Sequence, residues 1–233
     1  VLRSADHADA FLLTPEEGAT SVWEALEAVC ARQPSRPAVG QRPVLARREA
    51  EGPGGRPQEK LTLGPYRWLT NGEFAAAAAA AGAGLVTLTG LMPGDAVVIY
   101  SETQRDWLVA ALGALRQGLR VVTVYATLGE SALQVACAQT KARALVVDPP
   151  RLDAVVRAAG ECPGLRHVVV LADGVDDQHR EALARRQVLA QSFAATVASG
   201  EVAPRAAAVV DPSDVAVVMY TSGTTAVPKA LHI

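Results

Sequence analysis

This sequence has few aromatic residues, few cysteines and a small net charge. Each of these features argues against certain classes of function. The 22 basic and 24 acidic residues give a net charge of −2, so no basic surface for nucleic acid is expected. The three cysteines, Cys30, Cys137 and Cys162, are far apart and form no C-x-x-C pair, which argues against a disulfide framework or a zinc site. They are expected to be buried, reduced, intracellular thiols. The four histidines also lack metal-ligand spacing.

Long uninterrupted apolar runs are also not expected in this sequence. No uninterrupted run is expected to reach the roughly 18 residues of a membrane span, and no signal peptide opens the chain. Any membrane association would therefore use segments outside this chain, and the protein is expected to be intracellular, in the cytoplasm or on the cytosolic face of the endoplasmic reticulum or another membrane. The chain begins at Val1 rather than Met and ends at Ile233, so we expect a fragment of a longer protein.

Apolar residues make up 50% of the sequence, and they alternate between strand-like and helix-like patterns. This alternation predicts an α/β fold with layered, mostly parallel sheets flanked by helices. Residues 1–20 are expected to be irregular, and residues 21–233 to form one partial domain that is incomplete at its end. The expected strands, separated by helical patterns, are 96–100, 119–125, 144–148, 167–171 and 215–220. Residues 38–60 suggest a hairpin, and residues 173–200 are expected to be largely helical.

Several helix ends are signalled locally. Reciprocal capping is expected for the pairs Ser21 and Glu24, Thr70 and Glu73, Ser101 and Gln104, and Thr127 and Glu130. The alanine-rich segment 75–81 should form a helix that can lie close against a neighbour, with Gly82 and Gly84 as its carboxyl-terminal cap. Trp107 and Tyr125 are interpreted as core residues, and Asp211 and Asp214 as turn residues rather than an acid/base pair.

The most informative segment follows the last expected strand. Thr221, Ser222, Thr224 and Thr225 surround Gly223, and Lys229 follows Pro228. Short hydroxyl donors, a glycine and a compact cation suit a polyphosphate at the carboxyl end of a strand. The spacing differs from the G-x-x-x-x-G-K-S/T pattern of P-loop nucleotidases. An ordinary Ser/Thr-rich surface turn is the alternative on hydroxyl content alone.

The string from Tyr220 to Ala230 resembles the phosphate-binding signature Y-T-S-G-S/T-T-G-x-P-K-G of adenylate-forming, or AMP-binding, enzymes. It departs from the signature at Ala226 and Ala230, where the family has glycine. If position 226 needs a left-handed backbone, alanine there costs roughly 1 kcal/mol or more. These departures bear on whether the protein is active, and they leave its resemblance to the family intact.

Further motifs resemble the long-chain acyl-CoA synthetase branch. They are residues 64–70 (G-P-Y-R-W-L-T), 101–111 (S-E-T-Q-R-D-W-L-V-A-A), 121–129 (V-V-T-V-Y-A-T-L-G) and 211–223. The resemblance implies that a fatty-acid carboxylate attacks the α-phosphate of ATP and that CoA then displaces AMP, with Mg²⁺ assisting the phosphates. It assigns ATP-phosphate binding to Thr221, Ser222, Gly223, Thr224, Thr225 and Lys229.

The family's other site motifs would lie after Ile233. No catalytic residue and no metal ligand is therefore expected within this chain, and the chain alone is expected to be inactive. Two alternatives stay open: a truncated paralogue or pseudoenzyme that has lost phosphate binding, and an adenylate-forming enzyme for another carboxylic acid.

Overall fold

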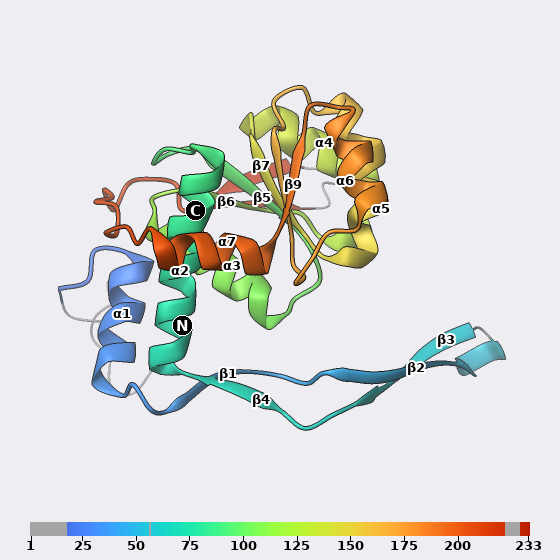
Figure 1. Ribbon diagram of the computed structural model, residues 1–233, viewed down its shortest axis with the longest axis horizontal. Coiled ribbons are helices and arrows are strands. Elements are labelled where there is room, and N and C mark those ends of the chain that lie inside the picture. The colour runs from blue at the N-terminus through green and yellow to red at the C-terminus, as the bar shows by residue number, and fades with distance from the viewer. Residues whose placement is uncertain (1–17, 56, 222–228) are drawn as a thin grey trace, which may run out of the picture.

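The computed structural model describes residues 18–55, 57–221 and 229–233. A seven-stranded sheet, in the order β11-β10-β6-β5-β7-β8-β9, forms its centre (Figure 1). All neighbouring strands pair in parallel except β10 and β11, which are antiparallel. The strands are β5 (Ala96–Tyr100), β6 (Arg120–Thr123), β7 (Ala144–Val147), β8 (His167–Val170), β9 (Leu189–Ser192), β10 (Val217–Thr221) and β11 (Lys229–His232). The predicted fold class is confirmed.

Helices cover both faces of this sheet because its strands are apolar on both sides. In β5, Val97 and Ile99 belong to one core cluster, whereas Val98 and Tyr100 belong to the other. The first cluster includes residues of α1 (Val22–Arg32), α2 (Asn71–Thr89), α3 (Arg105–Arg116) and α7 (Phe193–Val202). The second includes residues of α4 (Gly129–Thr140), α5 (Leu152–Ala158) and α6 (Asp177–Ala184). A layer of helices on each side therefore encloses the sheet.

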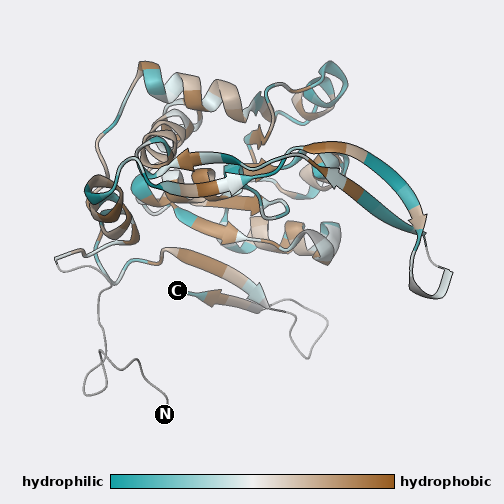
Figure 2. Cartoon of the chain, turned by 90° about the horizontal axis from the view of Figure 1, so that it is seen from below, coloured by the Kyte–Doolittle hydropathy of each residue, from teal (hydrophilic) through white to brown (hydrophobic). Residues whose placement is uncertain are grey.

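A two-stranded ribbon projects from this body (Figures 1 and 2). Its near part pairs β1 (Pro37–Gln41) with β4 (Arg67–Thr70), and its far part pairs β2 (Val44–Glu51) with β3 (Pro57–Leu63). Gly40 lies opposite Trp68, and a Cβ on Gly40 would lie 2.8 Å from the indole ring, so the aromatic side chain covers the glycine. Trp68 also stacks on Tyr66, with 5.3 Å between ring centroids. The predicted hairpin is confirmed and extends past residue 60.

Helix α2 corrects the prediction that Gly82 and Gly84 end the alanine-rich helix. The helix continues to Thr89 and is capped by Gly90, whose φ is 64°. Gly82 and Gly84 instead lie where other backbones come close: a Cβ on Gly82 would lie 2.2 Å from the Gly113 carbonyl oxygen of α3, and one on Gly84 would lie 1.7 Å from the Thr196 carbonyl oxygen of α7. Glycine is required there by close packing, whereas the predicted helix start is confirmed by a full capping box of Thr70 and Glu73.

Helix α2 contains no uninterrupted apolar run of about 18 residues, but its average composition is apolar enough for a membrane span. Its 19 residues are also long enough, and 44% of its most apolar window is buried inside the structure. Phe74, Ala78, Ala81 and Leu85 are each less than 5% exposed and belong to the core cluster under the sheet. The apolar character of α2 is therefore accounted for by its packing against α3 and α7.

Other predicted helix starts are corrected in detail. At α1, Ser21 accepts a hydrogen bond from the Glu24 amide, but the Glu24 carboxylate accepts from Thr20 rather than from Ser21. At α3 the cap is Gln104, which makes no side-chain capping bond. Its amide side chain instead donates to Ser101 Oγ at 3.1 Å.

Two further differences concern later segments. The predicted cap of Thr127 and Glu130 is wrong: α4 begins at Gly129 after a short 3-10 turn, its cap residue is the apolar Leu128, and Glu130 pairs with Arg157 of α5. Within 173–200 the structure adds a strand, β9, between α6 and α7. The three cysteines are buried and free, as expected, and burial raises the pKa of the Cys30 thiol.

Candidate functional site

Strand β10 brings the predicted phosphate-binding segment to one edge of the sheet. Val218 and Tyr220 are each 1% exposed, which reflects the apolar run that predicted a buried strand. β10 runs parallel to β6, with Val217 beside Val121, so its carboxyl end lies at the same edge as those of β5 to β9. Ligands of open α/β sheets bind at this edge.

The loop after β10 connects the two strands of a hairpin. Thr221, the last residue of β10, is the partner of Lys229, the first residue of β11. The structure therefore brings together the backbones of the two outermost predicted phosphate-binding residues. The other four, Ser222, Gly223, Thr224 and Thr225, lie outside the described residues. β6 and β11 flank β10 in the sheet, and β11 forms the edge.

The two positions that depart from the family signature differ in what the structure says of them. Ala230 lies in β11 opposite Tyr220 and is exposed. Among the described non-glycine residues only Lys141 and Gln187 have positive φ, so Ala230 needs no glycine-like backbone and its methyl group is accommodated. Ala226 lies outside the described residues. The doubt about phosphate binding therefore concentrates on position 226.

An ion-pair cluster with one buried member, Asp148, occupies the carboxyl ends of β5 and β7, on the same sheet edge. Asp148 follows β7 and is 4% exposed. Its Oδ2 accepts a hydrogen bond from Arg151 at 2.6 Å and one from the Glu102 amide at 3.1 Å. Arg151 also binds the Glu102 carboxylate. Burial lowers the pKa of Arg151, but the hydrogen bond to Asp148 and the charge of Asp148 together outweigh this effect. The pKa of Arg151 is therefore raised overall.

This cluster fixes the turn after β5 to the turn after β7, which sequence reasoning did not foresee. Asp148 Oδ1 is enclosed and has no hydrogen-bond partner among the described residues. Arg151 is therefore the charged partner of this buried carboxylate, and removing one member of such a pair is destabilising. A charged residue directly after an apolar strand was the signal in the sequence, but one of its partners, Glu102, follows a different strand, β5.

The interpretation of Tyr125 as a core residue is wrong. It follows β6, the neighbour of β10, and is 58% exposed. The expected strand 119–125 ends earlier, at Thr123, so Tyr125 lies in the turn at the carboxyl edge. Trp107, in contrast, is partly buried against the α2 and α3 core cluster, as expected.

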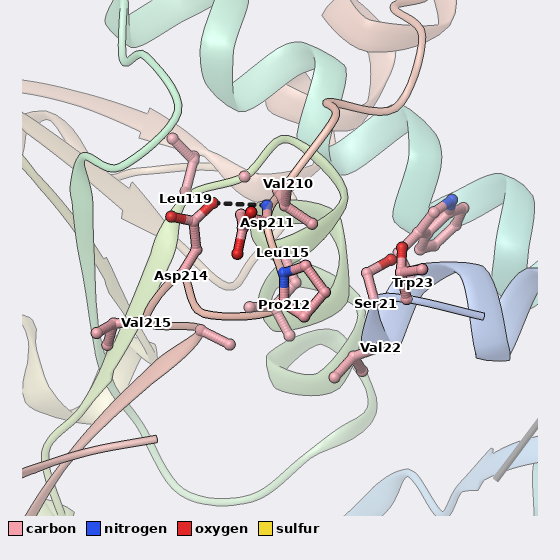
Figure 3. Close-up of a pocket in the computed structure, with 13 residues that line it drawn as sticks. Ser21, Val22, Trp23, Leu115, Leu119, Val210, Asp211, Pro212, Asp214 and Val215 are labelled. Atoms are coloured by element: carbon pink, nitrogen blue, oxygen red, sulfur yellow. Dashed lines mark hydrogen bonds between the residues drawn. The ribbon is translucent and has the colours of Figure 1, made fainter. Parts of the chain in front are cut away.

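A pocket of about 140 Å³ lies at the opposite, amino-terminal edge of the sheet (Figure 3). Asp211 and Asp214 form a turn there, because the Asp211 amide donates to Asp214 Oδ2 at 2.9 Å and Ser213 donates to Asp211 Oδ1. The hydrogen bonds from Ser213 hold the pKa of Asp211 below its usual value. The turn interpretation is confirmed, and this pocket is remote from the predicted phosphate-binding segment. Its lining includes Ser21, Trp23, Leu115, Leu119, Pro212 and Val215.

Within residues 18–55, 57–221 and 229–233, no group of three or more His, Cys, Asp or Glu residues is placed to hold a metal ion. The donors that the sequence supplies near β10 are hydroxyl groups, amides and one lysine. This set suits an anion, and it offers no carboxylate to a cation.

Comparison with known proteins agrees with this geometry. The sequence model of the protein family described as "AMP-binding enzyme" matches residues 26–233 of this chain. Long chain acyl-CoA synthetase 8 of Arabidopsis thaliana is 29% identical over 220 residues, which cover 94% of this chain and 30% of that protein. The peroxisomal long chain acyl-CoA synthetase 7 of the same organism is 31% identical over 179 residues, with 76% and 25% covered. This chain thus spans less than a third of the length of these relatives.

Solved structures show the same fold. The A-PCP didomain of carboxylic acid reductase from Segniliparus rugosus, solved with AMP, superimposes with a TM-score of 0.75 at 22% identity. The match covers 94% of this chain and 32% of that chain. A long-chain-fatty-acid-CoA ligase from Archaeoglobus fulgidus matches with a TM-score of 0.66 at 16% identity, covering 91% and 36%.

Proposed function

We propose a function from one established premise: this chain belongs to the AMP-binding enzyme family. The full-length protein activates a long-chain fatty acid with ATP, giving an acyl-adenylate and pyrophosphate, and transfers the acyl group to CoA. The curated relatives named as long-chain acyl-CoA synthetases support the choice of acid. ATP, CoA and the fatty acid are then its small-molecule partners, and Mg²⁺ is the expected counterion of the phosphates.

The observation that carries the proposal is the hairpin of β10 and β11 at the carboxyl edge of a parallel sheet. The backbone of Thr221 lies opposite that of Lys229, and the residues between them supply three hydroxyl groups and a glycine. Donors held in this way can bind the β- and γ-phosphates, and their charge stabilises the leaving pyrophosphate as the carboxylate attacks the α-phosphate. The chain's own part in the reaction is therefore to hold and neutralise pyrophosphate.

Fatty-acid-dependent exchange of labelled pyrophosphate into ATP by the full-length protein tests this role. Lys229→Ala should lower the exchange rate roughly tenfold or more, because it removes the cation of the loop. Lys60→Ala, at an exposed lysine of the ribbon, is the matched control and should exchange at the normal rate. No exchange by the folded wild-type protein with fatty acids of several lengths would refute the proposed function.

Ala226 favours a second candidate, a paralogue that keeps the fold and has lost phosphate binding. The same assay separates the two, because exchange that appears only after Ala226→Gly identifies the loss. Exchange with aryl or short-chain acids alone would instead identify an adenylate-forming enzyme for another acid. An intracellular location, membrane attachment through segments outside this chain, and the domain division at residue 20 stay predictions.

A further inference from the structure

Tyr220 is held by a hydrogen bond that the family signature does not require of it. Its hydroxyl group donates to Oε1 of Gln139, on α4, at 3.0 Å. The two residues are 81 positions apart in the sequence, so this bond joins β10 to the helical layer on one face of the sheet. Tyr220 is also the last residue before Thr221, where the predicted phosphate-binding segment begins.

The donor end of this bond is buried, whereas its acceptor, Gln139, is exposed. Tyr220 is 1% exposed and is among the largest fully buried side chains of the described chain. Burial raises the pKa of the phenol, so the hydroxyl group stays protonated and remains a donor. Its backbone is paired on the other side with Ala230 of β11. One residue thus contacts both α4 and the returning strand.

We propose that Tyr220 and Gln139 are positioning residues for the phosphate-binding loop. Neither touches the nucleotide: their hydrogen bond fixes where β10 ends, and through the pairing of Tyr220 with Ala230 it fixes where β11 begins. The end of β10 is thereby tied to α4 directly, and the start of β11 is tied to it through the backbone pairing of Ala230 with Tyr220. This inference rests on the proposed function, because it assigns the held segment a role in binding pyrophosphate.

The first test is independent of activity. Tyr220→Phe keeps the ring that fills the core and removes only the donor. It should increase amide hydrogen exchange, measured by mass spectrometry, about threefold to tenfold in peptides covering Val218–Thr221 and Lys229–His232, because one neutral hydrogen bond is lost. Peptides from β7 and β8 should be unchanged. Unchanged exchange at both strand ends would overturn the inference whatever the activity.

The second test separates positioning from general stability. In pyrophosphate exchange by the full-length protein, Tyr220→Phe should raise the KM for pyrophosphate about threefold to tenfold, while the maximal rate changes less than twofold. Gln139→Leu should reproduce this effect, Gln139→Glu should retain the acceptor and the normal KM, and the double variant Tyr220→Phe/Gln139→Leu should be no worse than either single one. Tyr66→Phe, on the ribbon, is the matched control.

The outcomes distinguish the two proposals. Suppose that the wild-type protein is active. The positioning role is refuted if Tyr220→Phe leaves the KM for pyrophosphate unchanged, or if Tyr220→Phe changes it and Gln139→Leu does not. Either result leaves the proposed function standing. A wild-type protein without exchange refutes the proposed function. In that case, faster amide hydrogen exchange in Tyr220→Phe would still support the anchoring of β10 and β11. Unchanged exchange would refute the positioning role as well as the proposed function.

Discussion

Replacing Gly84 with alanine tests the close contact between α2 and α7. A Cβ at this position would lie 1.7 Å from the Thr196 carbonyl oxygen, half of the 3.4 Å at which ordinary contact begins. The obstacle is backbone rather than a side chain that could rotate. The same two helices meet again where a Cβ on Gly200 would lie 1.8 Å from the Ala80 carbonyl oxygen. The helices must therefore separate if the methyl group is to fit.

Two opposing effects set the size of the loss. Alanine is favoured over glycine in a helix by about 1 kcal/mol. Against this, a gap of about 0.5–1 Å removes a quarter to a half of each dispersion contact along the interface, and overpacking a core costs about 1–3 kcal/mol and at times more. The 1.7 Å contact is far below the 3.0 Å that Cβ atoms almost never cross, and it is with backbone, so the clash outweighs the helix preference. We expect Gly84→Ala to lower the free energy of unfolding by about 2 kcal/mol or more.

Urea unfolding followed by circular dichroism measures this change. Gly160→Ala is the matched control, because Gly160 is exposed, has no positive φ and would place its Cβ with no heavy atom within 4 Å. It should be neutral or slightly stabilising. A Gly84→Ala protein as stable as the wild type, with an unchanged denaturant slope, would refute the argument that backbone contact requires glycine at this position.

Two further predictions concern charged groups. His179 bridges Asp176, at 2.6 Å, and Asp153, at 2.9 Å, and the hydrogen bond to Asp176 is the main cause of its raised pKa. A pKa that is raised in the folded state contributes stability below the unfolded-state pKa, and this stability is lost as the pH rises through the folded-state pKa. His179→Asn should therefore destabilise the protein more at about pH 5.5 than at about pH 8.5. Equal losses at both pH values, measured by urea unfolding, would contradict this. Arg151→Met should lower the free energy of unfolding by about 3 kcal/mol because it leaves the buried Asp148 carboxylate unpaired, and the double variant Arg151→Met/Asp148→Asn should recover part of this loss. A single variant that unfolds at the wild-type urea concentration would show that Asp148 does not depend on Arg151.

Local signals in the sequence predicted local features well. The capping box at Thr70 and Glu73 and the turn at Asp211 and Asp214 involve residues within four positions of each other, so their patterns carry enough information. The alternation of strands and helices predicted the parallel sheet for a similar reason, because the hydrophobic periodicity of each element is contained in its own residues. The loop after β10 was found because hydroxyl groups, glycine and lysine follow a buried strand.

The failures have different physical causes. Gly82 and Gly84 look like a helix cap until Gly113 and Thr196 are known to touch them, and these contacts lie far away in the sequence. β9 lacks the continuous apolar run of its neighbours because it lies at the sheet edge, where Leu189 is 64% exposed. Tyr125 lies outside the core because β6 ends two residues earlier, at Thr123.

The antiparallel return of β11 has a consequence for how this protein can change over evolutionary time. Every other connection within the seven-stranded sheet passes through a helix that also fills a core. Among the described residues, β11 pairs with β10 alone at the edge of the sheet, and none of its residues belongs to either core cluster. Changes in the sequence of β11 can therefore accumulate without disturbing either helical layer. Ala230, one of the two departures from the family signature, lies in this strand.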